Sequence, residues 1–345
     1  MAKRQSIQLA TMIAISAAFV TVPHFLFYYI VFVWKSSSLL FVDLFFGLVG
    51  ISVGFLAARA LFPPLGPLNE LDEAIANGEF VPYFQPIINL GSSEIAGFEM
   101  LARWIKRDGS MVPPALFIPL AENFGRIDAL LFALLRQAGL SIGQELRANP
   151  HLKLSFNVTP EQFLDPQFLP RLLGVLKLVD LPPSCLIAEI TERQPINDLD
   201  LACEVIAQYK KHGIRIAIDD AGTGHNGLSS IQKLDVSTIK LDKIFIDGIV
   251  DNERARQMVE MLANLAHQYQ MSVVAEGIET PGQALAAQAM GIKEGQGFYF
   301  ARPLPANDLL SLLDEQKKPL TQNNTPKTSP KLTTIKRVDN MRIAC

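Results

Sequence analysis

Seven short stretches rich in apolar residues each end on an acidic residue, an amide or a lysine, and most alternate with helical segments. They are IAGFE at 95–99, LKLSFN at 152–157, CLIAE at 185–189, IRIAIDD at 214–220, STIK at 237–240, VVAE at 273–276 and GQG at 295–297. One polar residue after one apolar run means little. Seven of them indicate strands whose polar ends meet at one mouth, as at the carboxyl ends of the parallel strands of (β/α)8 barrels.

In the segments between these strands, apolar residues recur at positions i, i+3 and i+4, as they do in amphipathic helices. These predicted helices are Ala121–Arg147, Leu199–His212, Glu253–Gln270 and Pro281–Met290. The strands SFNV, IAEI, IAI and SVVA are apolar nearly throughout, as strands buried on both faces must be. We therefore predict an α/β fold, with a TIM-like (β/α)8 barrel at residues 68–316 preceded by two transmembrane helices.

The predicted membrane helices occupy residues 1–67. The stretch Gln5–Trp34 contains no formally charged residue. It is longer than the ~20 apolar residues that a bilayer crossing needs. A turn at Lys35–Ser38 leads into a second apolar span, Leu39–Phe62, interrupted only by Asp43 and Arg59. Basic residues before the first span favour a cytoplasmic N-terminus, and two crossings return the chain to the cytoplasm. A cleaved signal peptide is the alternative, although the apolar region is long for one.

The two flanking regions have different compositions from the barrel region. Proline and glycine at 62–67 predict a domain boundary. Residues 317–345 are rich in Lys, Thr, Asn, Pro and Ser and predict a disordered basic tail, either solvated or in contact with anionic lipid. Gly50 and Gly54 have the small-xxx-small spacing that lets membrane helices approach closely, whereas the alternative is an ordinary lipid-facing helix.

Charge and cysteine usage exclude some kinds of function. The formal net charge of −3 argues against a protein that binds DNA or RNA polymers through a basic face. The three cysteines have no CxxC or CxxH spacing, so neither a zinc site nor a disulfide scaffold is indicated.

The strand-end residues indicate metal chemistry. Glu99, Asn157, Glu189, Asp219 and Asp220 bring four carboxylates and a carboxamide to one mouth. Oxygen ligands select Mg²⁺ or Mn²⁺, and two such ions about 3.5–4 Å apart form a clamp for in-line attack on a phosphodiester. There Lys240 could orient water or neutralise charge, and Glu276 could take the proton of that water. Any single carboxylate could equally be a helix cap or a surface ion pair, but the whole set favours a metal site.

At these residues the chain resembles the EAL-domain phosphodiesterases, bacterial enzymes that hydrolyse cyclic di-GMP to linear pGpG. The resemblance runs from about residue 68 to 313. It is carried by YFQPII, GFEMLARW, FNVTP, AEITE, IDDAGTGHNGLSSIQKLDVSTIKLDKIFI, VVAEGIET and GQGFYFARPLP.

The resemblance implies a role for each matching residue. Glu99, Asn157 and Glu189 would be metal ligands, Asp219 would bridge two Mg²⁺ or Mn²⁺ ions, and Asp220 would bind the second ion. Lys240 would orient water and Glu276 would act as the base. Gln85 and Arg103 would hold the dinucleotide, with Gln296 supporting the site. Glu192 would anchor the loop after Asp220.

The sequence also departs from the family pattern. Met100 replaces the usual alanine and is expected to face the barrel wall. Ala221, His225 and Asn226 alter the loop that in the family couples the metals to the dimer interface, so a homodimer is expected but its strength is open. The expected protein is a membrane-anchored hydrolase with its catalytic domain in the bacterial cytoplasm. The alternatives are a catalytically inactive cyclic di-GMP receptor, which typically lacks one of these residues, and a membrane scaffold.

Overall fold

The structure is a computed structural model that describes residues 49–52, 66–191, 196, 198–221 and 233–317. The chain divides into two compact units, Met1–Glu70 and Leu71–Cys345. The helices are α3 (Pro67–Ala76), α4 (Pro114–Asn123), α5 (Ile127–Ala148), α6 (Pro160–Leu164), α7 (Phe168–Leu178), η1 (Pro183–Cys185), α8 (Leu199–Lys211), α10 (Lys243–Ile246), α11 (Glu253–Gln268), α12 (Pro281–Ala289) and α13 (Ala306–Lys317). The strands are β1 (Phe80–Asn89), β2 (Ile95–Ile105), β3 (Met111–Val112), β4 (Lys153–Val158), β5 (Leu186–Thr191), β6 (Arg215–Asp219), β7 (Thr238–Leu241), β8 (Ser272–Ala275) and β9 (Glu294–Gly295).

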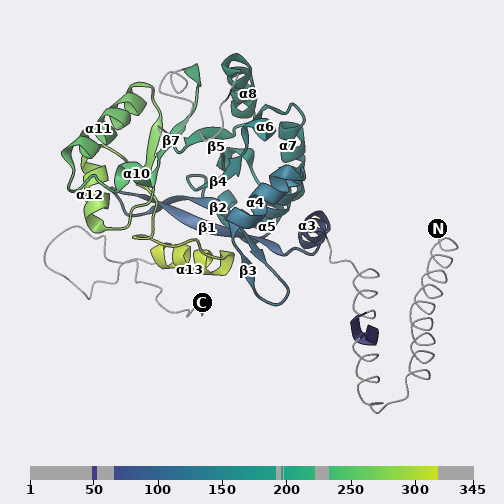
Figure 1. Cartoon of the computed structure of the whole chain (residues 1–345). Helices are drawn as coiled ribbons and strands as arrows, with labels where there is room; N and C mark the ends of the chain where they lie inside the picture. The colour runs from purple at the N-terminus through teal and green to yellow at the C-terminus, as the bar shows by residue number, and fades with distance from the viewer. Residues whose placement is uncertain (1–48, 53–65, 192–195, 197, 222–232, 318–345) are drawn as a thin grey trace, which may run out of the picture. The chain divides into compact units, whose positions relative to one another are not determined.

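The strands of the second unit form a closed barrel, which confirms the predicted (β/α)8 architecture. Their order is β1-β9-β8-β7-β6-β5-β4-β2-β3, and an additional β1–β2 pairing closes the ring. The seven strands from β2 to β9, β3 excepted, run parallel to one another and correspond to the seven predicted stretches. The eighth barrel strand, β1, runs antiparallel to both β2 and β9. Figure 1 shows the strands at the centre with helices around them.

The barrel strands are buried on both faces because their side chains alternate between the helices and the interior. Residues that face the helices are apolar and fully buried, namely Leu154, Phe156, Ala188, Ile190, Ile216 and Ile218, which are exposed by no more than 2%. The alternate residues face the interior, and near the carboxyl ends of the strands many of these are polar. Closure of the barrel therefore brings the polar strand ends together.

The helix predicted at Ala121–Arg147 is two helices in the structure, and that prediction was wrong in this respect. Helix α4 ends at Asn123, and α5 begins at Ile127. Between them Gly125 has φ 63°, a left-handed conformation that glycine adopts at little cost and that ends a helix. This break matters because α4 lines one side of the cleft described below.

The predicted membrane spans and the tail from residue 318 onward lie almost entirely outside the described residues. Among the residues that the structure does describe, no helix combines the length and the apolar character needed to cross a bilayer.

Candidate active site

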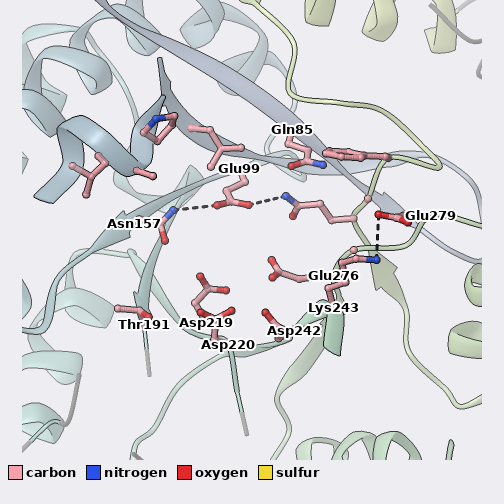
Figure 2. A pocket seen from close by; sticks show the side chains of 18 of the residues that line it. Gln85, Glu99, Asn157, Thr191, Asp219, Asp220, Asp242, Lys243, Glu276 and Glu279 are labelled. Carbon is pink, nitrogen blue, oxygen red and sulfur yellow. Dashed lines mark hydrogen bonds and ion pairs between the residues drawn. The ribbon is translucent and has the colours of Figure 1, made fainter. Parts of the chain in front are cut away.

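A cleft of about 780 Å³ opens over the carboxyl ends of the barrel strands (Figure 2). The structure brings most of the predicted site residues together there. Seven of them line the cleft, namely Gln85, Glu99, Asn157, Asp219, Asp220, Glu276 and Gln296. Two more, Glu189 and Lys240, are almost completely buried at 1% exposure and are held within the same cluster by ion pairs.

Lys240, on β7, is the electrostatic centre of the cluster. Its ammonium is surrounded by four carboxylates: Nζ lies 2.7 Å from Glu276 Oε1, 2.8 Å from Glu189 Oε2, 3.3 Å from Asp219 Oδ1 and 3.5 Å from Glu99 Oε2. These carboxylates come from four different strands or strand ends. A buried ion pair needs such close geometry to offset the cost of removing its charges from water.

Glu99 is held by two amide side chains. Asn157 Nδ2 donates to Glu99 Oε1 at 3.1 Å, and Gln296 Nε2 donates to Glu99 Oε2 at 2.7 Å (Figure 2). Gln85 lies opposite Glu99 in the β1–β2 register, and its Nε2 donates to the carbonyl of Ala301 at 3.3 Å. The orientation of Glu99 is therefore fixed by neighbours on β4 and just after β9.

Asp219 and Glu276 also form an acidic group with Asp220, because the ligand oxygens of these three residues lie within 4.8 Å of one another. Asp219 ends β6 and Asp220 follows it. In a continuing strand these two residues would face opposite sides. Asp220 instead has φ 56°, and both carboxylates line the cleft. Such a left-handed conformation is costly for a non-glycine residue and is found where a site requires it.

Burial and mutual repulsion perturb the pKa values of these acids. Burial is the main cause that raises the pKa of Glu189 and of Glu276 to about 8, with neighbouring carboxylates adding to it and Lys240 opposing it. Burial also acts to raise the pKa of Glu99, but Lys240 and the two amide donors outweigh it and lower that pKa. Burial alone would lower the pKa of Lys240, yet its carboxylate partners raise it well above its usual value.

The cluster fits divalent cations. The cluster contains five carboxylates (Glu99, Glu189, Asp219, Asp220 and Glu276) and one ammonium, that of Lys240, which leaves a formal charge of −5 + 1 = −4 when all are ionised. Asp219 Oδ1 and Gln296 Oε1 are buried and accept no hydrogen bond from the described residues, although Lys240 lies near the former. Carboxylate and amide oxygens are the donors that Mg²⁺ and Mn²⁺ prefer. Two divalent ions would neutralise the deficit.

Other residues named from the sequence either do not line the cleft or lie outside the described residues. Arg103 lines an adjoining cavity of about 270 Å³, where its guanidinium carbon is 5.4 Å from the centre of the Tyr83 ring. Met100 lines the same cavity and is 4% exposed. Because it follows Glu99 in β2, its side chain belongs to the opposite face of the strand, toward the barrel wall, as expected. Glu192 and the altered positions His225 and Asn226 lie outside the described residues.

The cleft also contains charged residues that the sequence reasoning missed. Asp242, Lys243 and Glu279 line it, and Lys243 Nζ lies 3.1 Å from Glu279 Oε1 (Figure 2). A signal existed for the first of them, because Asp242 follows Lys240 by two residues and lies just past the end of β7, where the polar strand-end residues gather. For Glu279, which lies in the turn after β8, the sequence carried no such periodicity.

Comparisons with known proteins agree with this geometry. The EAL domain family profile matches residues 68–303. "Probable cyclic di-GMP phosphodiesterase PdeB" of Escherichia coli is 34% identical over 267 residues, covering 76% of this chain and 51% of PdeB. "Cyclic di-GMP phosphodiesterase PA2567" of Pseudomonas aeruginosa is 34% identical over 238 residues, covering 69% of this chain and 40% of PA2567.

The chain thus spans about half of these curated relatives or less. Among solved structures, the complex of the PaMucR phosphodiesterase with c-di-GMP superimposes with a TM-score of 0.65 at 29% identity, over 70% of this chain and 99% of that one. With the family profile matching most of the barrel unit, the chain belongs to the EAL domain family, the family of these cyclic di-GMP phosphodiesterases.

Proposed function

We propose that this protein hydrolyses cyclic di-GMP to linear pGpG with the help of two Mg²⁺ or Mn²⁺ ions. The observation that carries the proposal is the acidic cluster of Asp219, Asp220 and Glu276 beside the buried ion pairs of Lys240. The names of PdeB and PA2567, and the ligand in the PaMucR complex, support the choice of substrate.

In this proposal the metal ligands divide into two sets, one for each ion. Glu99, Asn157, Glu189 and Asp219 would hold one ion, and Asp219 and Asp220 would hold the other. When bound, the ions supply Lewis acidity to the reacting phosphodiester and stabilise the charge that develops on it.

The protein's own groups move the proton. Glu276 accepts a proton from water as the water oxygen forms a bond to phosphorus, and the phosphorus–O3′ bond breaks with the proton returned to O3′. Lys240 favours the ionised forms of its carboxylate partners and orients the water.

A direct assay tests the hydrolase. The purified protein is incubated with cyclic di-GMP and Mg²⁺ or Mn²⁺, and nucleotides are separated by chromatography. Appearance of pGpG, lost in the Glu99→Ala variant, supports the proposal. The second candidate is an inactive receptor, and the completeness of the site disfavours it. Binding of cyclic di-GMP with no pGpG at any metal concentration would favour the receptor instead.

We further propose that residues 1–67 form a two-helix membrane hairpin, that 68–316 form the catalytic domain in the bacterial cytoplasm, and that 317–345 form a basic tail. The uncharged stretch Gln5–Trp34 supports the hairpin. Of two reporters fused after Gly66, the one that is active only in the cytoplasm should give a signal, and the one that is active only in the periplasm should not. Activity of a periplasmic reporter at that position would contradict this topology.

A homodimer is the last part of the proposal, supported by the spacing of Gly50 and Gly54. Crosslinking of the full-length protein in membranes tests it. Replacing Gly50 by Leu should reduce the crosslinked dimer, and an unchanged yield would reduce the hairpin to an anchor.

A further inference from the structure

The wall of the cleft carries an excess of negative charge. Seven carboxylates line it, namely those of Glu99, Glu122, Asp219, Asp220, Asp242, Glu276 and Glu279. Among the described residues that line it, Lys243 is the one lysine or arginine. Lys240 is buried within the carboxylate cluster, and Arg103 lines the adjoining cavity. Among the described residues, Lys243 is therefore the cationic side chain on the wall of the cleft that could bind an anion.

The backbone fixes where Lys243 lies. A Cβ built on Gly277 would come within 2.5 Å of Lys243 Cβ and Cγ, so the stem of the lysine crosses the backbone immediately after Glu276. Gly277 also has φ 67°, a conformation that suits glycine. Figure 2 shows Lys243 beside Glu276 on one side of the cleft. The stem of Lys243 is thus held against the backbone that follows Glu276, and its ammonium points to Glu279.

The ammonium is available to a ligand at small cost. Its contacts are Asp247 Oδ1 at 2.5 Å and Glu279 Oε1 at 3.1 Å, and the side chain is 43% exposed. An ammonium has three donors, and these contacts use two of them. Because ion pairs in contact with solvent contribute little, exchanging one carboxylate for a phosphodiester costs little.

The substrate of the proposed function carries two phosphodiester groups, each with one negative charge. One of them reacts at the acidic cluster, where bound ions would neutralise it. The other must lie in a cleft whose remaining charged side chains include Asp242, Glu279 and Glu122. We propose that Lys243 binds this second, non-reacting phosphodiester and so selects diesters with two phosphates over diesters with one. The inference rests on the proposed hydrolysis of cyclic di-GMP.

The test compares two substrates in one enzyme. Cyclic di-GMP has two phosphodiesters, whereas bis(p-nitrophenyl) phosphate has one and releases coloured nitrophenolate. The key variant is Lys243→Met, which keeps the aliphatic stem over Gly277 and removes the charge. Lys243→Arg keeps a charge, and Lys210→Met is the matched control, because Lys210 forms a surface ion pair with Asp235 away from the cleft. All are measured as full-length protein with saturating Mn²⁺.

We expect Lys243→Met to lower kcat/KM for cyclic di-GMP by about tenfold relative to that for bis(p-nitrophenyl) phosphate, mainly through KM, since a charge-assisted hydrogen bond is lost. Lys243→Arg should restore most of this ratio, and Lys210→Met should leave it unchanged. Raising the salt concentration should reduce the difference in this kcat/KM ratio between the wild type and Lys243→Met, because salt screens the charge of Lys243.

An unchanged ratio in Lys243→Met, or an equal fall for both substrates, would overturn the inference and leave the proposed hydrolase intact. A wild-type protein that hydrolyses neither substrate would overturn the proposed function itself. If Lys243→Met fails to fold, as judged by its thermal midpoint, Lys243→Gln takes its place with the same expected ratio.

Discussion

The two ends of the barrel strands differ in their balance of charge. Strand β4 begins at Lys153 and reaches Asn157 near its carboxyl end, and β6 runs from Arg215 to Asp219. At the amino ends the charges are mixed, because the two basic residues are accompanied by Glu294, the first residue of β9. At the carboxyl ends the acids outnumber the single buried lysine five to one.

The two ends also differ in how their charges are neutralised. Lys153 Nζ donates to the carbonyls of Pro150 at 2.7 Å and Ser184 at 3.0 Å, so protein groups satisfy it. Burial lowers the pKa of Arg215 while the charge of Glu294 opposes that shift. The cluster at the carboxyl ends, in contrast, keeps a net negative formal charge that the described protein groups do not neutralise. The charges at the amino end are thus satisfied by protein groups, whereas the acidic group at the carboxyl end, where (β/α)8 barrels carry their active sites, is consistent with a metal site.

The largest expected effect distinguishes the two ends by metal removal. Treatment with EDTA should abolish hydrolysis of cyclic di-GMP, and Mg²⁺ or Mn²⁺ should restore it, because the oxygen donors at the mouth select such ions. Calorimetry should find metal binding lost in Asp219→Asn and retained in Glu294→Gln. Full activity in EDTA, or recovery with Zn²⁺ alone, would contradict the assignment of the mouth.

A pair of isosteric variants compares the ends directly. Glu276→Gln should lower kcat by about 10²- to 10⁴-fold, the contribution of a general base. Glu294→Gln, at the other end of the barrel, should change kcat by less than about twofold, since surface and structural positions rarely affect chemistry. Equilibrium binding of cyclic di-GMP should survive in both variants. Near wild-type turnover in Glu276→Gln would remove Glu276 from its proposed role.

The pH dependence of stability gives a smaller but diagnostic difference. The pKa values of Glu189 and Glu276 are raised from 4.5 to about 8, so between these values the folded metal-free protein holds more protons than the unfolded chain. Its free energy of unfolding should therefore fall as pH rises from about 5 to 8. Burial also raises the pKa of Glu294, which adds a decrease of the same sign.

Mg²⁺ separates these two contributions. Saturating Mg²⁺ should remove the decrease due to Glu189 and Glu276, because bound ions favour their ionised forms, and should leave that of Glu294. Thermal midpoints at pH 5, 6, 7 and 8, with EDTA or with Mg²⁺, measure the difference. Equal slopes in the two conditions would show that no cation relieves the mouth.

The smallest effect belongs to the amino end. Lys153→Met removes two hydrogen bonds to carbonyls and should lower the free energy of unfolding by about 1 kcal/mol, since this lysine remains largely in contact with water. The thermal midpoint should fall by about 2–4 °C. The kcat for cyclic di-GMP should stay the same, and a large loss of activity would blur the distinction between the two ends.

The sequence predicted most of the barrel, with two informative exceptions. The strand stretches were found because buried strands read as apolar runs. The antiparallel direction of β1 was missed, although only Leu90–Glu94 separates it from β2, and so short a connection permits a hairpin but no parallel crossover. The break between α4 and α5 was missed because the apolar periodicity continues across Gly125.

The donor chemistry of the site was determined by the sequence alone. Because the carboxyl ends of the barrel strands meet at one mouth, the order of residues along each strand predicted that Asp219 and Glu276 lie at that mouth. Oxygen donors of this kind select hard divalent ions in any fold. These conclusions needed only the order of residues along each strand.

The tertiary structure decided which of these groups share a partner. Lys240 contacts acids from β2, β5 and β6 and the acid that follows β8, and only the register and closure of the barrel set those distances. The separation of Arg103 into an adjoining cavity, and the position of Lys243 over Gly277, likewise arise from packing between segments far apart in the chain. Electrostatic interactions depend on distance and burial in space, and the order of residues along a strand specifies neither between strands.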